Sequence, residues 1–122
     1  MLPARLRRLP AYHIGDGAVV LEANTPRARL LGLAGLDEDA LPPRHALLLR
    51  PCRSVHTFGM RFDLTLIFLG PDGRFVLIES GVPPARIRGS LVATAVLEMR
   101  TRDAPLFIEL SERIPPALPA AA

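Results

Sequence analysis

Apolar and polar residues alternate in the middle of the chain, over a stretch that begins at Phe58. From Phe58 to Phe68 every second residue is apolar, and most of the residues between them are polar or glycine. A period of two residues is typical of a β-strand that buries one face. We therefore predict a core strand over residues 58–69, with its phenylalanine side chains and Met60 in the core.

Short strand signals recur on both sides of this stretch. Gly15-Asp16-Gly17 predicts the turn of one hairpin, and Gly70-Pro71-Asp72-Gly73 predicts the turn of another. The strand after the second turn, residues 75–78, is apolar on both faces, and we expect it at the centre of a sheet. Glu98 and Glu109 occupy the polar positions of two later strands. The other apolar runs that predict strands are residues 12–14, 18–23, 46–50, 91–99 and 106–110.

One short helix is predicted over residues 26–34. The Thr25 hydroxyl can cap its first turn, Pro26 suits the first helical position, and Gly35 can end it. The acidic residues 37–39 predict one further exposed turn of helix. About six to eight short strands with one helix indicate a mainly β protein, either a sandwich or a partly closed barrel.

The length of 122 residues suits one domain with one core. We predict that residues 11–114 form this single β-rich domain. Residues 1–10 contain two prolines and no clear period, which indicates an irregular arm. The proline- and alanine-rich residues 115–122 are expected to be a disordered tail.

All fifteen basic residues are arginine, yet the net charge is only +3. A surface for nucleic acid would cluster that charge with aromatic residues. Only Arg5, Arg7 and Arg8 cluster, beside a single tyrosine, and we therefore expect no nucleic-acid partner.

Cys52 is the only cysteine, so an internal disulfide is excluded and a reducing compartment is favoured. The first residues lack the apolar run of a signal peptide, and no stretch of about 18 apolar residues exists to span a bilayer. The sequence predicts a cytoplasmic protein without a membrane partner.

The run RPCRSVHTFGMRF at residues 50–62 resembles the family called domain of unknown function 192. The resemblance extends over residues 27–99, from a lead-in helix to the segment Val96-Leu97-Glu98. It implies a small β-rich prokaryotic domain without an established activity. Thr65 stands where the family has an aspartate, and Asp63 lies two residues earlier on the same strand face. If that aspartate is catalytic in relatives, the resemblance implies impaired chemistry here.

Arginines gather at the bend that precedes the predicted core strand. Because a guanidinium group pairs with carboxylates or phosphates through two hydrogen bonds, such a cluster favours binding of an anionic small molecule or an acidic segment of a partner protein. The alternative is that Arg61 pairs with Asp63 on an exposed face and that Arg53 is merely solvated. The candidate ligand-binding residues are Arg50, Arg53, Ser54, His56, Thr57, Arg61 and Asp63.

Cys52 and His56 offer a different chemistry, either a thiolate–imidazole pair or two ligands of a metal. The simpler interpretation is that Cys52 is a small buried residue and His56 a structural histidine. No phosphate loop, esterase elbow or metalloprotease motif is present. We therefore assign no catalytic residue, metal ligand or cofactor. A third alternative is an interaction module that recruits a partner strand at a sheet edge, with the oligomeric state left open.

Overall fold

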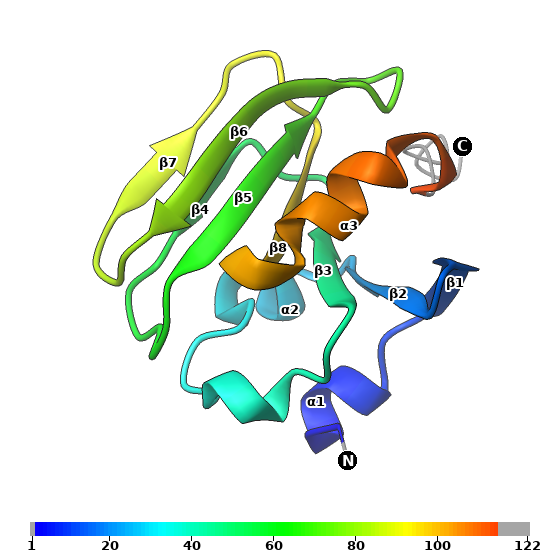
Figure 1. The fold of residues 1–122 in the computed structure, drawn as a ribbon. Coiled ribbons are helices and arrows are strands. Elements are labelled where there is room, and N and C mark those ends of the chain that lie inside the picture. Colours follow the sequence, from blue (N-terminus) through cyan, green and yellow to red (C-terminus); the bar gives the residue numbers. More distant parts are fainter. Residues whose placement is uncertain (1, 115–122) are drawn as a thin grey trace.

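The computed structural model describes residues 2–114, which form eight strands in two sheets and a few short helices (Figure 1). The larger sheet has the order β1-β2-β3-β8-β5-β6, and β4 pairs with β7 in the smaller one. This architecture confirms the predicted mainly β class. The strands are β1 (Ala11–Gly15), β2 (Ala18–Ala23), β3 (His45–Leu49), β4 (Ser54–His56), β5 (Leu64–Leu69), β6 (Phe75–Val82), β7 (Ile87–Gly89) and β8 (Ala95–Arg100).

Both predicted hairpins are present. Strands β1 and β2 pair antiparallel around the turn at residues 15–17, and β5 pairs antiparallel with β6. In the second turn the Gly73 N–H donates to the Gly70 carbonyl oxygen at 2.9 Å. The sheet is open, because β1 and β6 form its two edges, so the fold is sandwich-like and does not close into a barrel.

Strands β2 and β3 are parallel and in register from Val19↔His45 to Ala23↔Leu49. A parallel pair needs a crossover connection, and here the crossover contains α2 (Pro26–Leu31) and the 3₁₀ turn η1 (Glu38–Ala40). Helix α2 begins as predicted, with its Ala28 N–H donating to Thr25 Oγ1 at 3.1 Å. It ends three residues earlier than predicted, because Gly32 leaves the helical conformation.

The larger sheet is covered on both faces, so β5 and β8 are buried along their whole length, and β3 is buried from Ala46 onward. One face packs against α3 (Ala104–Glu109), which crosses in front of the sheet in Figure 1. The other face packs against the connection that contains α2 and against β4, through residues such as Leu33 and Val55. Each of these strands alternates its apolar side chains between the two cores.

The predicted strand over residues 58–69 is wrong in its first half, because β5 begins only at Leu64. The preceding residues form a loop in which Gly59 has a φ of 79°. Met60 and Phe62 are buried, as predicted, but they reach the core from this loop. Phe58 is half exposed and stacks on a histidine ring, so its assignment to the core is wrong.

The predicted strand over residues 106–110 is also wrong, since this segment belongs mainly to α3. Its apolar residues Leu106, Phe107 and Leu110 recur at a helical spacing and face the sheet. The run at residues 91–99 becomes a strand only at Ala95, where β8 starts.

Two further expectations about position are corrected. Strand β6 is an edge strand, not a central one, and its Val76 and Ile78 side chains are exposed. Glu98 does not occupy a solvent-facing position, because it is only 1% exposed in a strand whose two faces are both covered. Glu109, in contrast, is exposed on α3.

The N-terminal segment, for which the sequence predicted an irregular arm, has regular secondary structure. It contains the helix α1 (Ala4–Arg7), whose Leu6 side chain is buried against the sheet. None of the helices within residues 2–114 has the length and apolar character needed to cross a membrane. The predicted disordered tail, residues 115–122, lies outside the described residues.

Candidate functional site

A cavity of about 340 Å³ lies beneath α2, between this helix and the segment that connects β3 to β4. Residues from three distant parts of the chain meet there: α2 with the following Gly32, the segment 51–60, and the middle of β8. The residues that line it are Pro26, Arg29, Leu30, Gly32, Pro51, Cys52, Arg53, Ser54, Val55, His56, Met60 and Glu98.

Glu98 is the buried carboxyl group of this cavity. Its Oε1 atom has no hydrogen-bond partner among the described residues. Burial raises the pKa of Glu98 to about 8, and a hydrogen bond from the Leu33 backbone N–H opposes this shift with a smaller effect. Glu98 is therefore mostly protonated and neutral at pH 7. It is also the only acidic residue among the described residues that line the cavity.

Gly32 gives the Glu98 carboxyl group its space. A Cβ atom on Gly32 would lie 2.7 Å from Glu98 Oε1, and the backbone has φ 49° and ψ −126°, a conformation that side chains oppose. Glycine at this position is therefore required both by the backbone and by the cavity.

We expect Gly32→Ala to lower the free energy of unfolding by about 1–3 kcal/mol through backbone strain alone, with the contact to Glu98 adding to this loss. Urea denaturation measures the change. Gly35→Ala is the matched control, because Gly35 also has a positive φ of 76° but no atom within 4 Å of its added Cβ. Equal losses in the two variants would contradict the role of the Glu98 contact.

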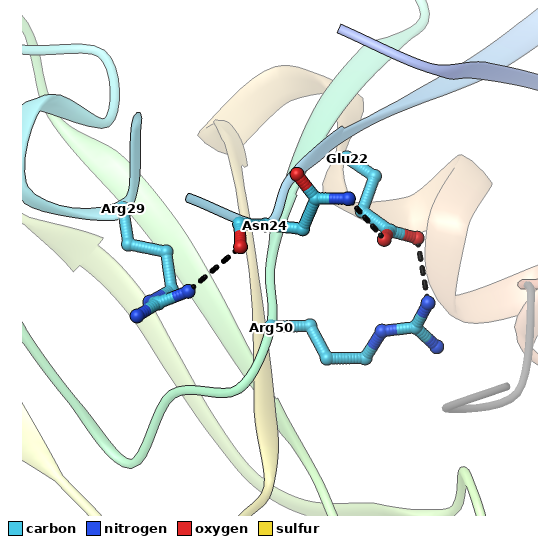
Figure 2. A network of polar contacts seen from close by, with 4 residues as sticks. All are labelled: Glu22, Asn24, Arg29 and Arg50. Atoms are coloured by element: carbon cyan, nitrogen blue, oxygen red, sulfur yellow. Dashed lines mark hydrogen bonds and ion pairs between the residues drawn. The ribbon is translucent and has the colours of Figure 1, made fainter. Parts of the chain in front are cut away.

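Two arginines supply positive charge to the cavity. Arg29 lies on α2 and donates from Nη1 to the Asn24 carbonyl oxygen at 3.0 Å, which holds the side chain (Figure 2). Arg53 comes from the segment before β4 and is exposed, and its side chain makes no hydrogen bond or ion pair with another described residue. Its guanidinium group is therefore available to a ligand.

Cys52 is half-buried, and its thiol donates to the Ser54 carbonyl oxygen at 3.2 Å. Burial raises the pKa of the Cys52 thiol, while the hydrogen bond to Ser54 and the charge of Arg29 lower it by smaller amounts. A raised pKa reduces the thiolate fraction at neutral pH, and the thiolate is the nucleophilic form. The cavity does not activate Cys52 as a nucleophile.

His56 lies at the opposite end of the same segment. Its Nε2 atom lies 3.2 Å from the Leu30 carbonyl oxygen, and since a carbonyl only accepts, Nε2 carries the hydrogen. The other ring nitrogen, Nδ1, is buried without a partner among the described residues. The ring stacks on Phe58, with the centroids 5.7 Å apart.

Arg50 lies outside the cavity lining. Its Nη2 atom is 2.7 Å from Glu22 Oε1 in an ion pair whose side chains are 12% and 5% exposed. Asn24 connects this pair to Arg29. Its side-chain amide donates to Glu22 Oε2 at 3.4 Å, and its backbone carbonyl oxygen accepts from Arg29 (Figure 2). Arg50 thus has a structural partner of its own.

The remaining candidate residues are dispersed. Thr57 is buried, and its hydroxyl donates to the Pro83 carbonyl oxygen at 2.7 Å. Arg61 pairs with Asp37 at 2.8 Å, not with Asp63. Asp63 is exposed and does not line the cavity.

Thr65, for which the resemblance implied an aspartate in relatives, is fully buried in β5, and its hydroxyl donates to Thr101 Oγ1 at 3.1 Å. It too lies outside the cavity lining.

Of the seven residues proposed from sequence, Arg53, Ser54 and His56 line the cavity together. Sequence reasoning missed Arg29 and Glu98 as site residues. A charged residue inside the apolar run Val96-Leu97-Glu98-Met99 was the available signal for Glu98. Nothing in the sequence of α2 distinguishes Arg29 from the neighbouring Arg27.

No group of three or more histidine, cysteine, aspartate or glutamate residues within residues 2–114 is arranged to hold a metal ion.

Two solved structures share this fold. A candidate transcription regulator from Sinorhizobium meliloti 1021 is 21% identical with a TM-score of 0.64, and the alignment covers 74% of each chain. A protein of unknown function from Novosphingobium aromaticivorans DSM 12444 is 20% identical with a TM-score of 0.62, and the alignment covers 90% of this chain and 91% of that one. A comparison with curated proteins gave no match.

The fold thus defines a small, open-sheet β domain of a kind also seen in a protein of unknown function. The family model of DUF192, described as "Uncharacterized ACR", matches residues 14–109. The chain belongs to the DUF192 family, which confirms the resemblance seen in its sequence.

Proposed function

We propose that this domain binds a small anionic molecule in the cavity beneath α2. The observation that carries the proposal is Arg53, whose guanidinium group lines the cavity and makes no ion pair or hydrogen bond with another described residue. Arg29 lines the same cavity, and Glu98 adds no negative charge while it is protonated. The lining therefore carries a net positive charge at pH 7.

The size and chemistry of the cavity suit such a ligand. Small-molecule sites have volumes of about 300–1,000 Å³, so a cavity of about 340 Å³ favours a small metabolite. A guanidinium group can bind a carboxylate through two parallel hydrogen bonds. The Ser54 hydroxyl adds a neutral hydrogen-bonding group to the lining.

Of the arginines that the sequence placed in one cluster, a single one is assigned to the ligand. Arg50 and Arg61 pair with Glu22 and Asp37, and only Arg53 of the three lines the cavity. An acidic segment of a partner protein is a less suitable ligand, because two of these three arginines already pair with carboxylates of the protein itself. The raised pKa of the Cys52 thiol also favours binding over nucleophilic catalysis.

Thermal unfolding in the presence of anions tests the proposal. We expect acetate, malonate or sulfate at millimolar concentration to raise the melting temperature of the wild type, because a ligand of the native state stabilises it. Arg53→Ala should abolish most of this shift. Arg88→Ala is the matched control, since Arg88 lies on the neighbouring strand β7 but does not line the cavity. An anion shift that is unchanged in Arg53→Ala would disprove the proposed site.

A further inference from the structure

We propose that the ligand of this cavity is a small carboxylate, and that Glu98 binds it as a neutral carboxylic acid whose O–H group donates a hydrogen bond to a carboxylate oxygen. The inference rests on the proposed function, because it assigns the ligand class and a donor within the same cavity. It also makes binding dependent on a proton that Glu98 holds.

The geometry of Glu98 is the first argument. The side chain is 1% exposed, lines the cavity, and leaves Oε1 without a partner among the described residues. A buried polar atom without a hydrogen bond costs about 1–3 kcal/mol, and native structures rarely leave one unsatisfied. Gly32 keeps the space beside this atom open, since a Cβ there would lie 2.7 Å away. The atom is thus placed to receive a partner that enters the cavity.

The protonation state is the second argument. An ionised Glu98 would repel an anionic ligand, whereas a protonated Glu98 offers it a donor. Burial raises the pKa of Glu98 to about 8, so the donor form predominates at neutral pH. The strand neighbours of Glu98 are the apolar Leu47 and Leu66, which add no charge.

Each element that packs on the cavity contributes a charged or titratable group. These groups could also affect how binding depends on pH. They are Arg29 from α2, Cys52 from the segment after β3, and Arg53 and His56 from the residues around β4. Arg5 lies behind the turn after α2, where it donates to the Gly32 carbonyl oxygen at 3.3 Å.

The ligand class follows from what the cavity offers. Two carboxyl groups that share a site favour the state with a single proton between them, which matches one neutral Glu98 and one ionised ligand. A phosphate site instead tends to offer several free backbone N–H groups. The Ala28 N–H in the first turn of α2 is already bound to Thr25, and Pro26 has no N–H to offer.

The decisive measurement is calorimetric titration with acetate and malonate between pH 7.5 and 9.5, with sulfate for comparison. None of these anions changes its charge in that range, and the Cys52→Ser background removes the thiol. We expect the carboxylate affinity to fall about tenfold per pH unit above the point where Glu98 ionises. Titration in two buffers of different ionisation enthalpy at pH 9 should show uptake of close to one proton per bound ligand.

Variants of Glu98 separate this role from a merely structural one. Glu98→Gln keeps an N–H donor but does not titrate, so it should bind acetate with an affinity independent of pH. Glu98→Leu removes the donor and should weaken acetate binding at pH 7.5 at least tenfold. If a Glu98 variant folds poorly, proton uptake measured in the two buffers with the protein that retains Glu98 still tests the role of this residue.

The outcomes distinguish the two proposals. If no anion binds at any pH, the proposed function itself fails. If carboxylates bind but take up no proton, or if Glu98→Leu binds them as tightly as Glu98 does, the function stands and the role of Glu98 is overturned. If sulfate binds and the carboxylates do not, the ligand class is overturned.

Discussion

Raising the pH from 5 to 8 should lower the free energy of unfolding by about 1.4 kcal/mol per pH unit through Glu98 alone, or about 4 kcal/mol in total. The pKa of Glu98 is about 8 in the folded protein, against an ordinary value of 4.5. Between these values the native state holds a proton that the unfolded state has lost. The stabilising effect is therefore complete below pH 4.5, decreases as the pH rises, and is lost above about pH 8.

Urea denaturation at several pH values, compared between the wild type and Glu98→Gln, isolates this effect. The glutamine variant should lack the slope, because its amide does not titrate. Glu109→Gln serves as the control, since Glu109 is exposed on α3 and its replacement should leave the slope intact. The same pH dependence in wild type and Glu98→Gln would show that Glu98 is ionised in the native state at neutral pH.

Asp103→Ala should lower the free energy of unfolding by about 3–5 kcal/mol, because it leaves a buried cation without its partner. Arg100 is only 2% exposed, although it is the largest side chain that the core encloses. Its Nε and Nη2 atoms lie 3.2 Å and 3.1 Å from Asp103 Oδ2, and its Nη1 donates to the Glu38 carbonyl oxygen at 3.0 Å. The carbonyl alone does not compensate the charge.

Chemical denaturation measures the loss of unfolding free energy in Asp103→Ala, and two further variants serve as controls. The double variant Arg100→Met with Asp103→Ala should be less destabilised than the single one, because it removes the cation together with its partner. Asp72→Ala removes one member of an exposed pair, at 3.6 Å from Arg74, together with an exposed hydrogen bond from the Arg74 N–H at 3.0 Å, and should cost only about 1–2 kcal/mol. A loss of similar size for Asp103→Ala and Asp72→Ala would contradict the importance of burial.

Apolar runs between turn signals predicted most strands of the larger sheet, whereas periodicity was the basis only for the strand predicted over residues 58–69. Periodicity failed at residues 58–63, where a loop folds over the core and buries Met60 and Phe62 at the same spacing. The prediction also failed at residues 106–110, because four apolar residues interrupted by Glu109 fit a strand and one side of a short helix equally well. The helix is favoured because it packs Phe107 against residues of the sheet that are distant in the sequence.

The site was predicted only in part, for a related reason. Arg53, Ser54 and His56 are close in the sequence, and a local cluster of polar residues identified them. Glu98 and Arg29 reach the cavity through the pairing of β8 with β3 and through the crossover that carries α2. A sequence pattern predicts that Glu98 interrupts an apolar run, but only the covered second face of the sheet makes it buried and neutral.

The parallel pairing of β2 with β3 has a consequence for how this family can diversify. Both strands point their carboxyl ends in the same direction, and the segments that follow them supply Pro26 and Arg29 on one side and Cys52 and Arg53 on the other. Open α/β sheets bind ligands at this end of their strands. The cavity therefore occupies the same position in a sheet whose other pairings are antiparallel. Since connecting segments tolerate changes in length and composition better than strands do, relatives can change the lining of this cavity and keep the sheet.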